Sequence, residues 1–314
     1  MQRYARVWIS AWNGRSAAGD AEATWQAVSR KQRRLIQDPT WGWIGRCCSD
    51  QTELGLAVAQ PLHAHLHGRL AIGLGTSKGS LAALPGIRID QALPGALTPR
   101  LAAELRLGSY LPCACAAACS TGLACLLAGA DLLERDQADS ALVGASEASL
   151  SPLIVAGFAN AGVLCGQTPP EAFATATGFA PAEGAAAVAL DRRAGPWRLV
   201  AGVRLGDAGH ETHFIDPATL RTALEGLWEA LPDPDLIICH ATGTAAGDAY
   251  ELAGLSHGPW HAAPRITCKP WIGHTLGASG VVELTAALHS PARHLWKLSL
   301  GFGGHLIAVA CQRE

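Results

Sequence analysis

The segment 114–145 constrains the fold of this chain more than any other. It joins a helix pattern, with Leu123, Leu126 and Leu133 on one apolar face, to a buried strand pattern at 139–145. An apolar stripe with helical spacing is typical of a helix that packs on a sheet. Short strands and helical patterns alternate in the same way along the rest of the chain, which predicts a layered α/β fold.

The predicted elements form two stretches, separated by a junction at 192–196. We therefore expect two βα-rich halves of unequal length, residues 1–195 and 196–314. The predicted strands are 7–10, 70–74, 139–145, 184–191, 197–205, 235–239, 265–268 and 305–311. The predicted helices are 21–36, 101–107, one that begins at Cys119, 219–230, 248–255 and 280–289, and a turn is expected at 299–304.

Composition narrows the possible partners. The chain is 49% hydrophobic and 16% charged, which predicts a sizeable core. Its formal net charge is −2 and it has no run of basic residues, so we expect no nucleic-acid partner. No apolar segment approaches the roughly 20 residues of a membrane span. We expect a cytoplasmic protein whose ten cysteines stay reduced and mostly buried.

Cys119 is the first candidate for chemistry. It lies in Ala-Ala-Cys-Ser-Thr-Gly, residues 117–122, where a loop meets the start of a helix. The free N–H groups and dipole of a helix N-terminus stabilise an anion, which favours a thiolate. Small neighbours would let a substrate carbonyl approach. The pattern predicts a nucleophile, and on local context alone a buried core cysteine is the alternative.

A first histidine follows the predicted strand 235–239. His240 precedes a tight turn, Thr242-Gly243-Thr244, so it lies at the carboxyl end of a strand, where side chains often face a cleft. The alternative is a loop histidine that bonds only to backbone groups.

A second histidine closes a glycine-rich loop before an apolar helix. The loop runs from Lys269, one of only four lysines, to His274, and Lys269 could pair with Glu283 on the helix that follows. The alternative is an ordinary surface loop. The turn 301–304, Gly-Phe-Gly-Gly, could add N–H groups to an oxyanion hole that includes the amide of Cys119, or it could be a simple hairpin turn.

Other signals are weaker. His63, His65 and His67 lack nearby ligands at metal spacing, so we expect a loop there. The stretch 210–213 is one residue short of the zinc-protease pattern, and the glycines at 73–79 match neither phosphate-loop nor dinucleotide patterns. We therefore predict no metal and no bound cofactor.

Taken together, these segments resemble β-ketoacyl-acyl-carrier-protein synthases of the thiolase-like superfamily. The resemblance covers most of the chain and keeps the family's order of motifs. It rests on residues 118–122, 141–164, 240–251, 269–280 and 301–304. It implies a layered αβαβα fold made of two related halves.

The resemblance also implies roles. Cys119 would accept an acyl chain as a thioester from the phosphopantetheine of an acyl carrier protein. His240 and His274 would promote decarboxylation of a malonyl thioester, whose carbanion attacks the acyl group. Lys269, with Glu283, would organise the site. The supporting residues are Phe302, as a gate between half-reactions, Gly303, Thr242 and Thr244.

Departures from the family pattern open a second hypothesis. The chain is short before Cys119 and between His274 and Phe302, Ala241 replaces the usual glycine, and 175–179 lacks the acidic residues normally found there. A compact chain of this kind could act as a chain-length-factor-like subunit that shapes a partner's tunnel. The retained catalytic residues favour an active synthase. We expect a dimer, as a heterodimer with a full-length ketosynthase, in fatty acid, polyketide or aryl polyene synthesis.

Overall fold

The structure, a computed structural model, describes residues 1–80, 92–174 and 177–314 of the 314-residue chain. Most of its strands follow one hydrogen-bonded path, in the order β12-β11-β13-β14-β10-β2-β9-β8-β6-β7. From the first half of the chain come β2 (Trp8–Ser16), β6 (Leu70–Gly75), β7 (Tyr110–Pro112), β8 (Ser140–Glu147) and β9 (Gly184–Asp191). The second half adds β10 (Trp197–Gly206), β11 (Leu236–Ile238), β12 (Arg265–Ile266), β13 (His294–Gly301) and β14 (His305–Arg313).

The second half repeats the strand order of the first. Outward from β2 the neighbours are β9, β8, β6 and β7, and outward from β10 they are β14, β13, β11 and β12. In both halves the first two pairings are antiparallel and the last two are parallel. The prediction of two related βα halves is confirmed, while the boundary between 195 and 196 stays a prediction.

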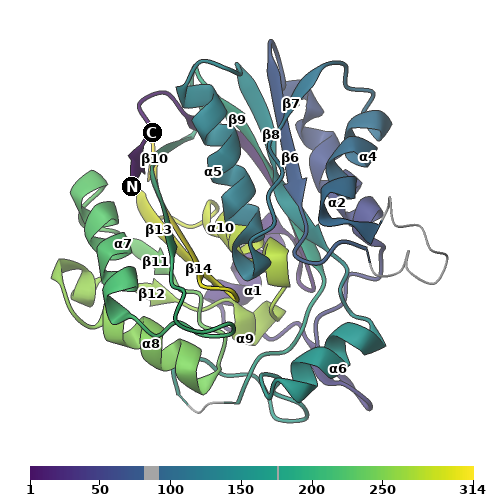
Figure 1. Ribbon diagram of the computed structural model, residues 1–314, viewed down its shortest axis with the longest axis vertical. Helices are drawn as coiled ribbons and strands as arrows, with labels where there is room; N and C mark the ends of the chain where they lie inside the picture. The colour runs from purple at the N-terminus through teal and green to yellow at the C-terminus, as the bar shows by residue number, and fades with distance from the viewer. Residues whose placement is uncertain (81–91, 175–176) are drawn as a thin grey trace.

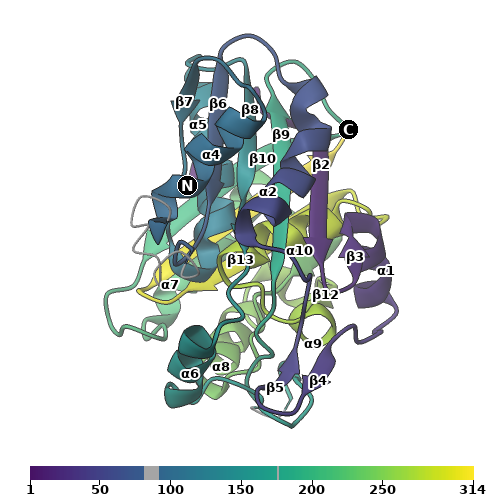
Figure 2. The same cartoon turned by 90° about the vertical axis from the view of Figure 1, so that its right-hand side faces the viewer.

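Helices separate and cover the two sets of strands (Figure 1). Helices α5 (Thr121–Glu134) and α10 (Ser279–Ala287) pack on each other, with α5 against β6 and β8 and α10 against β9 and β13. On the outside of the first half lie α2 (Gln51–Ala59) and α4 (Leu97–Glu104), which Figure 2 shows in front of the strands. On the outside of the second half lies α7 (Pro217–Ala230), with α8 (Ala245–Leu255) beside it. The layered α/β prediction is confirmed.

Further short helices and strands surround these elements. They are β1 (Gln2–Arg3), β3 (Gly19–Asp20), α1 (Ala21–Ser29), β4 (Ile36–Asp38), β5 (Gly42–Ile44), α6 (Pro152–Asn160) and α9 (Lys269–Ile272). The 3₁₀ helices of the described residues are Gln60–His65, Pro94–Ala96, Ala118–Ser120, Pro259–Ala262 and Leu276–Ala278.

The first predicted helix is shorter than expected. It ends at Ser29 rather than at position 36, because Lys31 adopts a φ of 54° and Gln32 donates its backbone N–H to the carbonyl of Ala27. Such a left-handed residue stops a helix by satisfying its last carbonyls. Leu35, which fits the apolar spacing of the helix, is buried in another cluster instead.

Three other predictions need correction. The helix expected at 101–107 spans Leu97–Glu104. The turn expected at 299–304 is partly strand, since β13 continues to Gly301 before turning back into β14. His63 and His65 lie in a 3₁₀ helix rather than a loop, and the described residues contain no group of side chains that could hold a metal ion.

All ten cysteines are free, and seven of them are buried, as expected. Within the part of the chain that the structure describes, no helix has the length and apolar character needed to cross a membrane.

Candidate active site

Cys119 lies in the 3₁₀ turn that leads into α5. The turn is tied to its surroundings by side-chain hydrogen bonds: Thr121 Oγ1 donates to the carbonyl of Ala118 at 2.7 Å and accepts from the N–H of Ala117 at 2.9 Å. Ser120 Oγ donates to the carbonyl of His305 on β14 at 3.0 Å. The side chain of Cys119 is therefore held in a rigid turn, and the residue is only 8% exposed.

The end of β13 lies directly against this turn. Ser299 Oγ donates to the carbonyl of Cys119 at 3.1 Å, and the backbone N–H of Phe302 hydrogen-bonds to the cysteine sulfur. A Cβ at Gly301 would come within 2.7 Å of the carbonyl of Ala117, so only glycine allows this approach. The glycine-phenylalanine turn predicted near Cys119 thus adjoins it.

His274 reaches Cys119 from the loop before α10. Its Nε2 lies 3.2 Å from the cysteine sulfur, which is hydrogen-bonding distance for a thiol. The loop is fixed by a bond from the His274 N–H to the carbonyl of Ala180 at 2.8 Å and by the ring of Phe179, packed edge-on at 4.9 Å. The sequence placed these residues 155 positions apart, and the fold brings them into contact.

His240 lies beside His274, with ring centroids 5.5 Å apart. Two carboxylates of α8 hold the turn that carries it. Glu251 accepts the backbone N–H groups of His240 and Ala241 at 2.6 and 2.7 Å, and Asp248 accepts that of Gly243 at 2.9 Å. Ala241 adopts a φ of 46°, the left-handed region that favours the glycine usual at this position of the family pattern.

Lys269 forms the ion pair that its sequence position suggested. Its Nζ lies 2.8 Å from Glu283 Oε1, and both side chains are buried. The ammonium also donates to the carbonyl of His240 and lies 3.4 Å from His240 Nδ1. Because an ammonium only donates, Nδ1 of His240 must accept, and the ring proton is on Nε2. This leaves an N–H donor at the Nε2 end of the ring.

Burial controls the charge of these groups. It is the main cause that raises the pKa of the Cys119 thiol, while Lys78, Lys269 and the Phe302 N–H act in the opposite direction. The expectation that a helix start would lower this pKa is wrong, because loss of water outweighs the helix terminus. Burial and the nearby lysines lower the pKa of His240 and of His274 well below the ordinary value, so both rings are neutral near pH 7.

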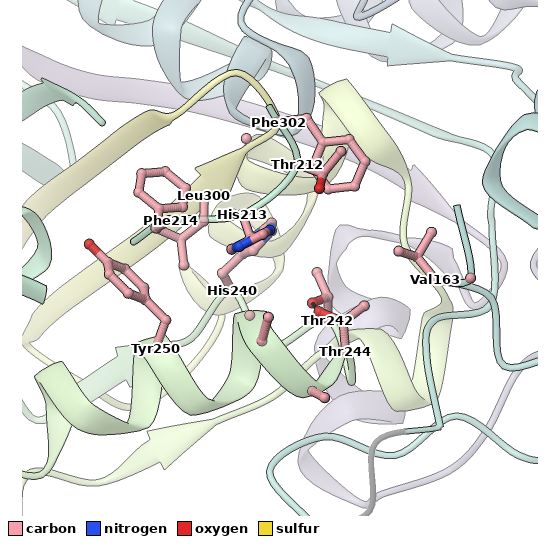
Figure 3. A pocket seen from close by; sticks show the side chains of 15 residues that line it. Val163, Thr212, His213, Phe214, His240, Thr242, Thr244, Tyr250, Leu300 and Phe302 are labelled. Atoms are coloured by element: carbon pink, nitrogen blue, oxygen red, sulfur yellow. Dashed lines mark hydrogen bonds between the residues drawn. The ribbon is translucent and has the colours of Figure 1, made fainter. Parts of the chain in front are cut away.

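A cavity of about 280 Å³ reaches this cluster from outside (Figure 3). Its wall includes His240, Phe302, Tyr250 and two threonines from the turn before α8, Thr242 and Thr244, whose hydroxyls are 2.9 Å apart. Cys119 itself is not part of the wall. Gly303, in the turn beyond Phe302, donates its N–H to the carbonyl of Glu211 at 2.7 Å.

Sequence reasoning missed two groups near Cys119. The first is an aromatic cluster in which Phe158 packs edge-on against Phe179 at 5.4 Å and against Phe302 at 6.4 Å. The sequence lacks the family's acidic residues at 175–179, and residues 175 and 176 of that stretch lie outside the described part of the chain. The second group is cationic: Lys78 lies over the Phe158 ring at 5.0 Å, and Lys297 contacts Glu283. The scarcity of lysine in the sequence was the signal that could have drawn attention to Lys78 and Lys297.

Two protein-family models match the chain. One is described as β-ketoacyl synthase, N-terminal domain, over residues 110–194, and the other as β-ketoacyl synthase, C-terminal domain, over residues 217–301. Together they cover more than half of the chain.

Curated relatives are polyketide synthases. A highly reducing polyketide synthase of Nectria sp is 31% identical over 57% of this chain, and an erythronolide synthase of Saccharopolyspora erythraea is 26% identical over 82%. The chain spans only 8% of the length of each of these large proteins. A putative polyketide β-ketoacyl synthase of Streptomyces coelicolor is 29% identical over 56% of this chain and 46% of its own.

Solved structures share the whole fold. One is described as a type II polyketide synthase acyl-carrier protein in complex with its ketosynthase bound to the hexaketide, and it superposes with a TM-score of 0.87 at 18% identity, with full coverage of both chains. Another is a ketosynthase in complex with its chain length factor from Xenorhabdus doucetiae, with a TM-score of 0.84 at 20% identity and full coverage of both chains.

Proposed function

The chain belongs to the β-ketoacyl synthase family, and we propose that it catalyses a decarboxylative Claisen condensation between an acyl group on Cys119 and a malonyl thioester. One observation carries the proposal: the Cys119 sulfur lies 3.2 Å from His274 Nε2, and the His240 ring lies next to that of His274. A nucleophile and two neutral hydrogen-bond donors are the groups that acyl transfer and enolate formation need.

The first half-reaction loads the enzyme. Cys119 loses its proton as its sulfur attacks the carbonyl carbon of an acyl thioester, and His274, in hydrogen-bond contact, is placed to take that proton. The backbone N–H groups of Cys119 and Phe302 can donate to the resulting oxyanion. Collapse breaks the bond to the carrier thiol, which leaves with the proton, and an acyl-Cys119 thioester remains.

The second half-reaction forms the carbon–carbon bond. Malonyl thioester enters, and the Nε2–H of His240 donates to its thioester oxygen. His274, which has passed the Cys119 proton to the carrier thiol, becomes the second neutral donor when its remaining ring proton moves from Nδ1 to Nε2. The bond to the carboxyl group breaks, CO₂ leaves, and its electron pair forms an enolate. The enolate carbon attacks the acyl-Cys119 carbonyl, the C–S bond breaks, and a 3-ketoacyl thioester departs from a Cys119 thiolate. Neutral rings are required, because a protonated imidazolium would hold the thiolate as an ion pair.

The substrates would arrive on an acyl carrier protein. We propose the cavity lined by His240 and Phe302 as the route for the phosphopantetheine arm. That arm carries amide groups, and the hydroxyls of Thr242 and Thr244 in the cavity wall can form hydrogen bonds with them. No cofactor is needed beyond this carried arm. Phe302, in a turn where Gly303 and Gly304 both have positive φ, is proposed to swing as the gate between the two half-reactions.

We also propose that the chain forms a dimer, and more specifically a heterodimer with a full-length ketosynthase. Among the described residues, β7 forms one end of the sheet and pairs with a strand on one side only, and its Leu111 is 40% exposed. Such an edge invites pairing with another chain. We place the complex in the cytoplasm, in keeping with ten free thiols.

Acylation of Cys119 is the direct test. We expect that incubation of the purified chain, with and without candidate partner synthases, with an acyl-carrier thioester adds the acyl mass to the peptide that contains Cys119, and that Cys119→Ala removes this adduct. Cys311→Ala is the matched control, since that thiol is completely buried on β14. An intact mass that never changes in the wild-type chain would sink the enzyme proposal.

The same variant separates the two roles that the sequence allowed. If the chain only shapes a partner's tunnel, product formation by the complex survives Cys119→Ala, whereas a catalytic chain loses its product. Native mass spectrometry of the complex, expressed with the neighbouring genes, identifies the partner.

A further inference from the structure

Behind the two histidines lies a lysine that the proposed reaction does not use. Lys297 on β13 is completely buried. Its ammonium can donate three hydrogen bonds and finds three acceptors: Glu283 Oε2 at 2.6 Å, the carbonyl of Leu298 at 2.7 Å and the carbonyl of Cys239 at 3.3 Å. A buried ammonium is tolerated where it is paired and its donors are used, and it is then held in one position.

These acceptors belong to the segments that build the site. Cys239 immediately precedes His240. Glu283 lies on α10, which follows the loop carrying His274. The third acceptor is on β13 itself, the strand that ends in the Phe302 turn. One side chain therefore joins all three segments.

We propose that Lys297 is a positioning residue of this active site, a second buried cation that locks Glu283 to the segments carrying His240 and the Phe302 turn. The inference rests on the proposed condensation for its kinetic readout only. Lys269 does not make these contacts, because its donors go to the other oxygen of Glu283 and to the carbonyl of His240. Each oxygen of the carboxylate thus has its own lysine.

The pair of lysines also sets the charge behind the rings. One carboxylate faces two ammonium groups, so a net positive charge remains there. Positive charge disfavours a protonated imidazole, and Lys297 contributes to lowering the pKa of both His240 and His274. The cations that act on the two rings are Lys78, Lys269 and Lys297, and the thiol of Cys119 contacts His274. Two carboxylates lie next to this group: Glu251 accepts the backbone N–H of His240, and Glu283 pairs with Lys269.

Two variants test the proposal. Lys297→Met keeps the length of the side chain without its charge, and Lys297→Gln keeps a donor for the carbonyls without the charge. In both we expect the histidine ring signals, followed by NMR with labelled histidine, to titrate at higher pH than in the wild type. We also expect kcat to fall on the order of 10²-fold with KM for the malonyl thioester little changed, as for a misplaced catalytic group. The acid limb of the kcat profile should move to higher pH.

Trp296→Phe is the matched control. Trp296 precedes Lys297 on the same strand and is equally buried, but its indole N–H donates to the carbonyl of Leu231 on the outer layer. We expect this variant to lose thermal stability without any shift of the histidine titration. If the Lys297 variants behave in the same way, Lys297 is only structural and the proposal is overturned.

If neither Lys297 variant folds, NMR of the wild-type protein tests the proposal. The chain has four lysines, so ¹⁵N-lysine spectra contain few signals to assign. The proposal requires a charged, slowly exchanging ammonium at Lys297 at pH 7 and neutral rings at His240 and His274. A neutral amine, or rings that titrate at the ordinary histidine value, would refute it. A chain that meets these requirements but never condenses substrates refutes the proposed function instead.

Discussion

Three residues with left-handed backbone lie within two positions of the proposed catalytic side chains. Ala118, Ala241 and Leu276 have φ values of 46°, 46° and 45°. A Cβ in this region approaches the following carbonyl oxygen, which costs about 1–2 kcal/mol per residue. Such conformations persist only where surrounding bonds hold them, as the two carboxylates of α8 hold the turn at Ala241. The site is therefore built from strained turns on a rigid frame.

Replacement of Ala241 by glycine measures that strain. Ala241→Gly loses a buried methyl group and gains flexibility when unfolded, but it removes a strain of similar size, so we expect an unfolding free energy within about 0.5 kcal/mol of the wild type. Ala308→Gly, at an equally buried but extended position on β14, has no strain to release and should cost about 1–2 kcal/mol. Urea unfolding measures both variants. Equal losses would show that Ala241 is not strained.

At the scale of elements, local pattern predicted most strands and helices but missed where several of them end. Strand β9 was predicted with its observed bounds, because every residue before its terminal Asp191 is small or apolar and a charged junction follows. Strand β13 was not predicted, and its last three residues fell within the turn expected at 299–304; Lys297 and Ser299 interrupt its apolar run. Both polar side chains are buried and bonded inside the protein, a circumstance that periodicity cannot reveal.

The close approach of β13 to the turn before α5 predicts the effect of one methyl group. Gly301→Ala would place a Cβ 2.7 Å from the carbonyl of Ala117 and 3.3 Å from the N–H nitrogen of Cys119, so the strand must move away from the nucleophile. We expect acylation of Cys119 to slow on the order of 10²-fold if the shift nears 1 Å. The control, Gly157→Ala in α6, meets nothing within 4 Å and should acylate at the wild-type rate. Equal rates in both variants would contradict this packing argument.

At the scale of the whole molecule, the site lies where two copies of one topology meet. The turn with Cys119 precedes α5 in the first half, and the loop with His274 precedes α10 in the second, and these two helices pack on each other in the central layer. The first half supplies Cys119, and the second half supplies His240 and His274. Their packing excludes water from the histidines, which is the main reason for their lowered pKa.

This burial predicts a pH-dependent stability. The unfolded chain binds protons at both histidines as the pH falls through about 6.5, whereas the folded chain, with the pKa of both rings lowered, does not. The free energy of unfolding should therefore decrease below that pH, by about 1 kcal/mol per histidine at one unit lower.

Urea unfolding at pH 7.5 and 5.5 tests this prediction. His274→Gln should show a smaller loss between the two pH values than the wild type, because one proton-binding difference is gone. His257→Gln, at an exposed position, should leave the loss unchanged. A wild-type stability that does not fall at pH 5.5 would rule the argument out.

The sequence by itself determined most of the order of elements, the two halves and the identity of the candidate residues, because periodicity, glycine turns and rare residues are local properties. Only the tertiary structure decided that Cys119 and His274 touch, that burial raises the pKa of the thiol, and that Lys297 shares Glu283 with Lys269. Distance and solvation depend on which segments the fold brings together. The segment around Cys119 therefore predicts a nucleophile, while its charge and partners come from β13, α10 and the loops between them.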